Sequence, residues 1–127
     1  MKKLLFFVVL LGCAKEEMEP RTYEESIMGT WERTSETYSQ CLDASNNMTL
    51  SCTRGCTRFT FTPDYKLAIT QYSEDGAVRD QIQTTFSVTG DQLVIRSNVY
   101  SCIISNGKMN WTGSDTGCSY KSELSRI

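Results

Sequence analysis

The chain contains no histidine, although it is 127 residues long. Histidine is the commonest general base, the commonest zinc ligand and the usual pH switch of proteins, so its absence removes all three. The G-x-S-x-G, Walker, dinucleotide-binding and calcium-loop motifs are missing as well. We therefore expect a protein that is not an enzyme and that carries no metal and no cofactor.

A cluster of basic residues is also lacking. Lys and Arg number 13 and Asp and Glu number 15, which gives a formal net charge of -2. From residue 27 onward the two signs nearly balance, and no stretch is strongly basic. Proteins that bind nucleic acid concentrate positive charge to neutralise phosphates. Nucleic acid is therefore not expected as a partner.

No long hydrophobic run is present either. The unbroken apolar run at residues 4–11 follows Lys2 and Lys3. As a helix this run would rise about 12 Å, whereas a bilayer span takes about 20 residues. A short apolar run behind positive charges is typical of a targeting segment that is removed from the mature protein. The alternative is a buried N-terminal strand.

The end of this run, Leu-Leu-Gly-Cys at residues 10–13, resembles the lipobox of bacterial lipoproteins. Leu11 departs from the small residue usual at that place. The resemblance implies a signal peptide over residues 1–12 and a mature chain that begins at Cys13. The sulfur of Cys13 would carry acyl chains such as palmitate, and stable anchoring needs at least two such chains.

Residues 13–26 form an acidic segment with five glutamates and one proline. A segment with this composition has little to bury and should remain solvated, as a tether between the membrane and the domain. Lys15-Glu16-Glu17 is similar to an export signal that sends some lipoproteins to the outer cell surface, and Ala14 is compatible with the outer membrane. We expect a lipid-anchored protein of the cell envelope, in the outer membrane, facing either the periplasm or the exterior.

From residue 27 onward, turn residues recur every eight to fifteen positions and apolar side chains alternate with polar ones. This period of two predicts half-buried antiparallel strands, and Asn106-Gly107 predicts a tight hairpin. The fold class is therefore all-β, with an eight-stranded up-and-down antiparallel barrel favoured over a two-sheet sandwich. The predicted strands span residues 27–37, 56–62, 65–73, 77–89, 91–96, 99–105, 107–113 and 117–126.

Three segments of this domain resemble small bacterial lipocalin-like lipoproteins. They are residues 27–33, with Gly29-Thr30-Trp31, and residues 59–67 and 86–95. The resemblance implies a lipocalin-like barrel over residues 27–127. It also implies that a basic residue near the chain end packs on the first-strand tryptophan. Arg126 has the strand parity to do so, within about 6 Å of Trp31, inside the closed end of the barrel.

Five cysteines follow Cys13, and outside the cytoplasm they favour disulfides over a metal site. Strand directions place all five at one rim of the barrel, opposite the termini. We expect one bridge within the first long loop, either Cys41–Cys52 or Cys41–Cys56. A second bridge, Cys102–Cys118, is less favoured because a strand lies between its cysteines, and an odd count leaves one cysteine unpaired. The five cysteines are Cys41, Cys52, Cys56, Cys102 and Cys118.

The predicted inward set is apolar and aromatic, which suits either a packed core or a pocket for a small hydrophobic ligand. This set is Trp31, Phe59, Phe61, Leu67, Ile69, Phe86, Leu93, Ile95, Tyr100, Met109, Trp111 and Tyr120. The candidate ligand-binding residues within it are Phe59, Phe61, Leu67, Phe86, Tyr100, Trp111 and Tyr120.

Two functional hypotheses follow. The first is a membrane-anchored binding module for a small hydrophobic ligand at the barrel mouth. The second is a protein-interaction or protease-inhibitor-type barrel with a filled core, whose partner would be another envelope protein. A ligand-sized cavity open at the rim would favour the first hypothesis, and a filled barrel the second.

Overall fold

The computed structural model describes residues 26–115 and 117–127. The predicted signal peptide (1–12), the predicted lipidation site Cys13 and the predicted tether (13–26), apart from Ser26, lie outside the described residues. No helix within the two described ranges is long and apolar enough to cross a membrane.

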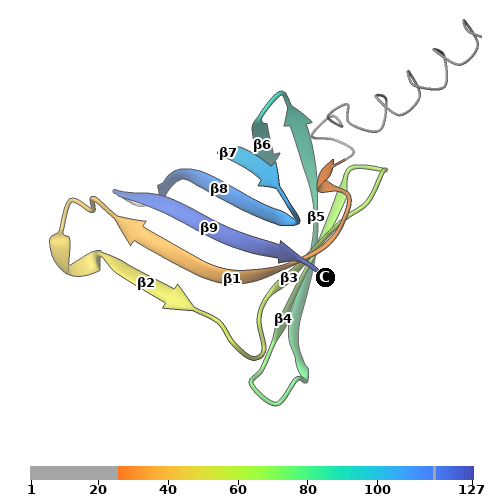
Figure 1. The fold of residues 1–127 in the computed structure, drawn as a ribbon, viewed down its shortest axis with the longest axis horizontal. Coiled ribbons are helices and arrows are strands. Elements are labelled where there is room, and N and C mark those ends of the chain that lie inside the picture. Colours follow the sequence, from red (N-terminus) through yellow and green to blue (C-terminus); the bar gives the residue numbers. More distant parts are fainter. Residues whose placement is uncertain (1–25, 116) are drawn as a thin grey trace, which may run out of the picture.

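The domain is a closed eight-stranded antiparallel β-barrel with one additional strand, which confirms the predicted all-β, lipocalin-like fold class (Figure 1). The strands are β1 (Gly29–Ser39), β2 (Met48–Ser51), β3 (Arg58–Phe61), β4 (Lys66–Tyr72), β5 (Val78–Thr89), β6 (Gln92–Ile95), β7 (Asn98–Ser105), β8 (Lys108–Asp115) and β9 (Cys118–Arg126). β1 pairs with β3, each strand from β3 to β9 pairs with the next one in the chain, and β1 closes the ring by pairing with β9. The eight predicted strands correspond to β1 and to β3 through β9.

The additional strand, β2, was not expected. It pairs only with the second half of β1, opposite residues 35–38, while β3 pairs with residues 29–32. The short 3₁₀ turn η1 (Ala44–Asn46) leads into it. All four side chains of β2 are exposed, so it lacks the buried face that produces a clear alternating pattern. The predicted long loop between the first two barrel strands therefore contains a strand of its own.

A β-bulge bends β1 and changes which of its side chains face inward. The register of β1 against β9 shifts between Arg33 and Ser35. Before the shift, Arg33 lies opposite the buried Leu124; after it, Glu36 lies opposite the buried Ser122. Bulges of this kind insert a residue and increase the local bend of a strand. Both charged residues, Arg33 and Glu36, therefore face the interior.

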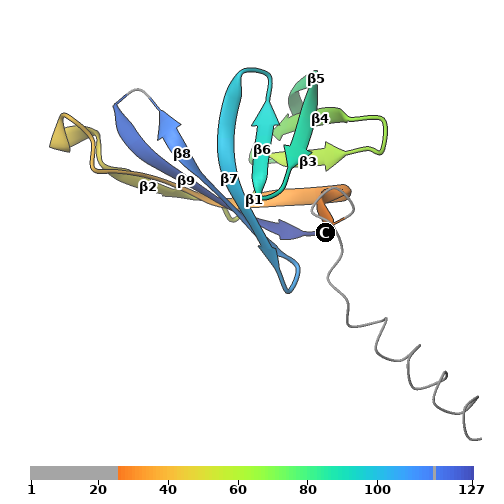
Figure 2. The same cartoon turned by 90° about the horizontal axis from the view of Figure 1, so that it is seen from above.

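Beyond the bulge the sheet runs out past the barrel. We call this region the sheet extension; it comprises β2 and residues 35–39, 112–115 and 118–122 of β1, β8 and β9. In Figure 2, β2, β8 and β9 extend to one side, and β3 to β7 lie on the other. Between the two regions, Cys52 donates its backbone N–H to the carbonyl of Thr34 at the bulge.

The closed end of the barrel is densely packed. The indole Nε1 of Trp31 donates to the carbonyl of Ile27 at 2.8 Å. The Cζ atom of Arg126 lies 4.2 Å from the centre of the Trp31 ring, so the predicted contact is present. The largest fully buried apolar side chains of the core are Ile27, Trp31, Phe61, Leu67, Leu93, Met109 and Leu124.

Arg126 caps this core from outside, so its predicted place inside the barrel was wrong. Its side chain is exposed, and it donates to the carbonyls of Met28, at 2.7 Å, and Ser26. Gly29, at φ +110, leaves the space for this approach, because a Cβ there would lie 2.9 Å from an Arg126 nitrogen. Arg126, at the end of β9, therefore holds the residues just before β1 in place through these hydrogen bonds.

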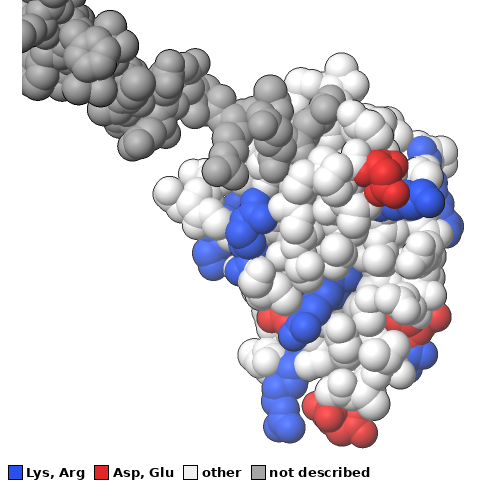
Figure 3. Space-filling view, turned by 90° about the vertical axis from the view of Figure 1, so that its right-hand side faces the viewer, with Lys and Arg blue, Asp and Glu red and all other residues white. Residues whose placement is uncertain are grey.

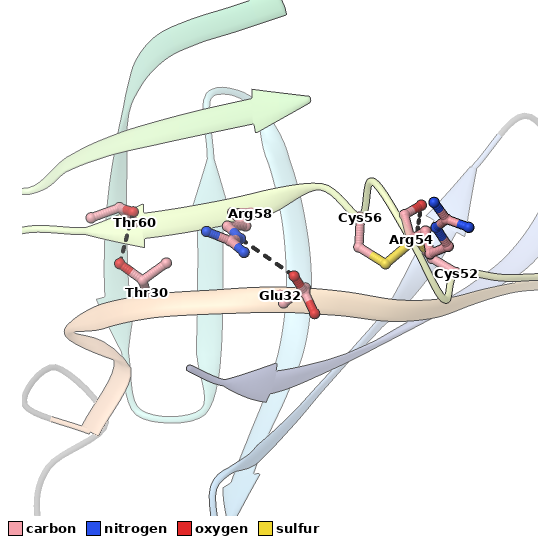
Figure 4. Close-up of polar contacts among 7 residues, drawn as sticks. All are labelled: Thr30, Glu32, Cys52, Arg54, Cys56, Arg58 and Thr60. Atoms are coloured by element: carbon pink, nitrogen blue, oxygen red, sulfur yellow. Dashed lines mark hydrogen bonds and ion pairs between the residues drawn. A yellow bond between two sulfur atoms is a disulfide. The ribbon is translucent and has the colours of Figure 1, made fainter. Parts of the chain in front are cut away.

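The disulfides are Cys41–Cys118 and Cys52–Cys56. The predicted pairs Cys41–Cys52, Cys41–Cys56 and Cys102–Cys118 were therefore wrong. The reason is the β1–β9 register: Ser39 lies opposite Ser119, so the residues just beyond this pair are already neighbours. Cys52–Cys56 closes the short loop into β3, next to the paired side chains of β1 and β3 (Figure 4).

Cys102 also contradicts the prediction that all five cysteines share one rim. It lies within β7, opposite Trp111 of β8, and its thiol is free and 1% exposed. Its backbone N–H donates to the carbonyl of Asp91 in the turn between β5 and β6. The predicted strand was nearly right, but the position of Cys102 along it was placed too close to the rim.

Replacing Trp31 tests the packing of the closed end. Trp31→Ala should lower the free energy of unfolding by about 3–5 kcal/mol, because it leaves a large cavity in the core. Arg126→Gln should lower it by about 0.5–2 kcal/mol through loss of the cation–π contact. Chemical denaturation measures both changes. Arg79→Gln, on the outward side of β5, is the control; equal losses for Arg126→Gln and Arg79→Gln would contradict the capping role.

The buried thiol of Cys102 should be unreactive in the folded protein. Burial, with a smaller effect of the Asp91 carboxylate, raises the pKa of Cys102 to about 12. In a Cys13→Ser chain, where Cys102 is the one remaining thiol, a thiol reagent should react after unfolding but not before. Because folding favours the protonated thiol, its contribution to stability should fall as pH rises from about 9 to about 12. Rapid reaction of the native protein near neutral pH would contradict this placement.

Candidate functional site

A cavity of about 220 Å³ occupies the barrel at the end opposite Trp31. We call it the mouth cavity. Its lining includes buried residues of the core, such as Phe59 and Trp111, together with residues of the open rim. The lining residues are Arg33, Phe59, Ile69, Ile82, Thr84, Ile95, Arg96, Asn98, Tyr100, Trp111 and Tyr120.

Aromatic rings form one wall of the mouth cavity. Trp111 meets Phe59 edge to face with ring centres 4.9 Å apart, and Tyr100 lies 5.7 Å from Trp111. Tyr100 also lies 6.2 Å from Tyr120. Gly113 makes room for this arrangement, because a Cβ at that position would come within 3.1 Å of the Tyr100 ring. The wall is thus a set of aromatic rings in mutual contact.

A partly buried ion pair lies beside this wall. The Arg33 guanidinium is 3.4 Å from Glu36 Oε1, and each side chain is only about one-fifth exposed. Tyr120 donates its hydroxyl to Glu36 Oε2 at 2.7 Å. The Cζ atom of Arg33 also lies 5.2 Å from the centre of the Phe59 ring. Arg33 is therefore held in place by a carboxylate and an aromatic face.

The phenol of Tyr120 stays protonated in this setting. Burial raises its pKa above the usual value, and the hydrogen bond to Glu36 raises it further. Burial raises the pKa of Tyr100 as well. Both phenols therefore stay neutral at physiological pH, and the single hydroxyl proton of Tyr120 is donated to Glu36.

The rim of the mouth cavity carries a second arginine. Arg96 occupies the tight turn between β6 and β7, with φ +58. Its Nε donates to Thr84 Oγ1 at 3.1 Å. Among the residues that the structure describes, no carboxylate forms an ion pair with Arg96. Its positive charge is therefore available at the opening.

Four of the seven predicted ligand-binding residues line the mouth cavity: Phe59, Tyr100, Trp111 and Tyr120. The other three, Phe61, Leu67 and Phe86, belong to the packed core, where Phe61 and Phe86 meet edge to face at 4.9 Å. Strand parity places all seven inside, but parity does not tell how far along the barrel axis a residue lies.

The lining residues that the candidate list missed are Arg33, Ile69, Ile82, Thr84, Ile95, Arg96 and Asn98. Ile69 and Ile95 were already in the predicted inward set. Arg33 follows Trp31 by two residues, and Ile82 and Thr84 share the parity of Phe86, so alternation could have identified these three. Nothing in the sequence pattern identifies Arg96 or Asn98, whose positions depend on the turn.

Two further hollows adjoin the mouth cavity on the sheet extension. One, of about 110 Å³, shares Arg33 with it; the other, of about 370 Å³, shares Leu50 with the first. The larger hollow also contacts Tyr38 and Met48, and its lining side chains are mostly exposed. We take the mouth cavity as the candidate site because its floor is continuous with the buried core.

Neither a cluster of metal-ligating side chains nor a patch of one charge sign indicates a second site among the described residues. Within residues 26–115 and 117–127, no three Cys, Asp or Glu side chains gather to hold a metal ion. On the face shown in Figure 3, Lys and Arg form a broken line with Asp and Glu beside it.

No protein-family model matches this chain, and no curated protein matches it significantly. The observations that bear on function are therefore the fold and the mouth cavity.

Proposed function

We propose that this protein is a binding module, without enzymatic activity, which holds a small, largely apolar molecule in the mouth of its barrel. The observation that carries the proposal is the mouth cavity itself, about 220 Å³ in volume, with an aromatic wall and aliphatic side chains facing it. Ligand sites are concave and mainly apolar, with a few polar groups that fix orientation. Arg33 and Arg96 are such groups here.

The division of the barrel supports this function. At the closed end, Trp31, Phe61 and Leu67 fill the interior and are no more than 1% exposed. At the mouth, Ile69, Ile82 and Tyr100 are only partly buried, although they face inward. Partly exposed apolar side chains inside a barrel leave surface that a ligand can cover, and covering it is favourable at about 25 cal/mol per Å².

The N-terminal pattern supports a location for this activity. The lipobox-like residues 10–13 would fix the mature chain to a membrane through lipid on Cys13, and the acidic residues 14–25 would separate the barrel from it. We place the protein in the cell envelope, anchored in the outer membrane. The two disulfides fit the oxidising environment of that compartment.

Filling the cavity tests the binding function. A panel of small uncharged aromatic molecules, such as benzyl alcohol, should shift NMR signals of residues around Trp111 and Tyr100. Ile82→Trp, which places a ring in the cavity, should abolish these shifts, because Ile82 lines it. Gln81→Trp, one residue away on the outer side of β5, is the matched control and should bind like the parent. No binding by the parent protein would overturn the proposal.

Removing the predicted lipidation site tests the anchor. Cys13→Ser should leave an unprocessed or soluble protein that is lost from the membrane fraction of the cell, because no acyl chain can be attached. Fractionation followed by a carbonate wash measures this. A variant that remains with the washed membrane would contradict anchoring through Cys13.

A second function is favoured by one observation on the sheet extension. β2 is an uncharged edge strand on which Met48 and Leu50 are 47% and 52% exposed, and Leu42 nearby is 94% exposed. Uncharged edges with exposed apolar side chains are where other chains pair with sheets. Native mass spectrometry of protein purified with its own envelope separates the two functions: a retained small molecule supports the first, a retained protein the second.

A further inference from the structure

We propose that the ligand of the mouth cavity is a compact aromatic or apolar carboxylate. Its ring or apolar part would lie inside the mouth cavity, and its carboxylate would accept hydrogen bonds from donors of the lining. This inference rests on the proposed binding function and specifies the chemistry of the ligand. Three observations carry it: a buried donor without a partner, an excess of positive charge, and the volume of the cavity.

The unpartnered donor is the indole N–H of Trp111. Trp111 lines the mouth cavity and is 2% exposed, yet its Nε1 has no hydrogen-bond partner among the described residues. An indole nitrogen can only donate, and nearly all buried donors in proteins are satisfied. The other tryptophan shows the usual situation, because Trp31 Nε1 donates to the carbonyl of Ile27. A ligand oxygen that came within hydrogen-bond distance of Nε1 would complete the bonding of Trp111.

The charge of the lining is positive. Arg33 and Arg96 both line the cavity, whereas no Asp or Glu does. Glu36 lies in the adjoining hollow and uses its two oxygens for Arg33 and Tyr120, and Asp115 lines the next hollow along. Glu36 therefore offsets one arginine and holds it in position, and the charge of the other is not offset. An anionic oxygen is the complement of such a set of donors.

The volume limits the size of the ligand. An apolar cavity of about 150 Å³ is known to hold benzene. The mouth cavity, at about 220 Å³, is larger and has room for one ring and a small head group. The aromatic wall of Phe59, Tyr100 and Trp111 favours a ring, because ring pairs prefer edge-to-face and offset contacts like those already present.

Three matched probes test the inference: phenylpropionate, its neutral amide phenylpropionamide, and the cation phenylpropylamine. Titration calorimetry should give phenylpropionate an affinity about ten- to a hundredfold higher than the amide, the range expected for charge-assisted hydrogen bonds. The cation should bind more weakly still. In NMR spectra, phenylpropionate should shift the indole N–H signal of Trp111 and leave that of Trp31 unchanged.

Variants assign this preference to named residues. Arg96→Gln, at the exposed rim, should reduce the advantage of the carboxylate over the amide at least several-fold, while Arg79→Gln on the outer face should not. Trp111→Phe keeps the ring contacts and removes the N–H, so it should weaken phenylpropionate more than benzyl alcohol. Equal affinity for carboxylate and amide, or preference for the amine, would overturn this inference while leaving the binding function standing. If benzyl alcohol does not bind either, both proposals fail.

Discussion

The pairing of β1 with β9 is the interaction on which the rest of the structure depends. It closes the barrel, and its register runs from Trp31 opposite Arg126 to Ser39 opposite Ser119. Each end of the β1–β9 strand pair has an additional contact. These are the Arg126–Trp31 contact at the closed end and the Cys41–Cys118 disulfide at the other end. Closure removes the free edges that an open sheet would expose. It also brings the start and the end of the domain together.

The β-bulge in β1 determines which charged side chains lie beside the mouth cavity. Because the register shifts between Arg33 and Ser35, both Arg33 and Glu36 face the interior. A buried charge is costly unless it is paired, and these two pair with each other. Tyr120 then donates to the same carboxylate. A local irregularity of one strand thus introduces a charged group into an otherwise apolar barrel, beside the cavity that we propose as the binding site.

The barrel is packed at one end and hollow at the other. Large side chains fill the closed end, and smaller or partly exposed ones surround the mouth cavity. A core this compact tolerates little loss of volume. The sheet extension adds a second accessible surface around β2. Binding of a small molecule and contact with another protein would therefore take place at the same end of the barrel, away from Trp31 and Arg126.

The sequence by itself determined the features that depend on neighbouring residues. Alternation identified eight barrel strands, and every residue of the predicted inward set is buried or partly buried, although Arg33, Ile82 and Thr84 were left out of that set. Asn106-Gly107 formed the expected turn, with φ of 53 and 73. Only the tertiary structure decided the features that join distant residues. Cys41 and Cys118 are 77 positions apart, and their pairing follows from the β1–β9 register. The inward position of Glu36 depends on a bulge, and the height of Phe61 or Trp111 along the barrel depends on strand stagger. Neither the bulge nor the stagger leaves a trace in a pattern of period two.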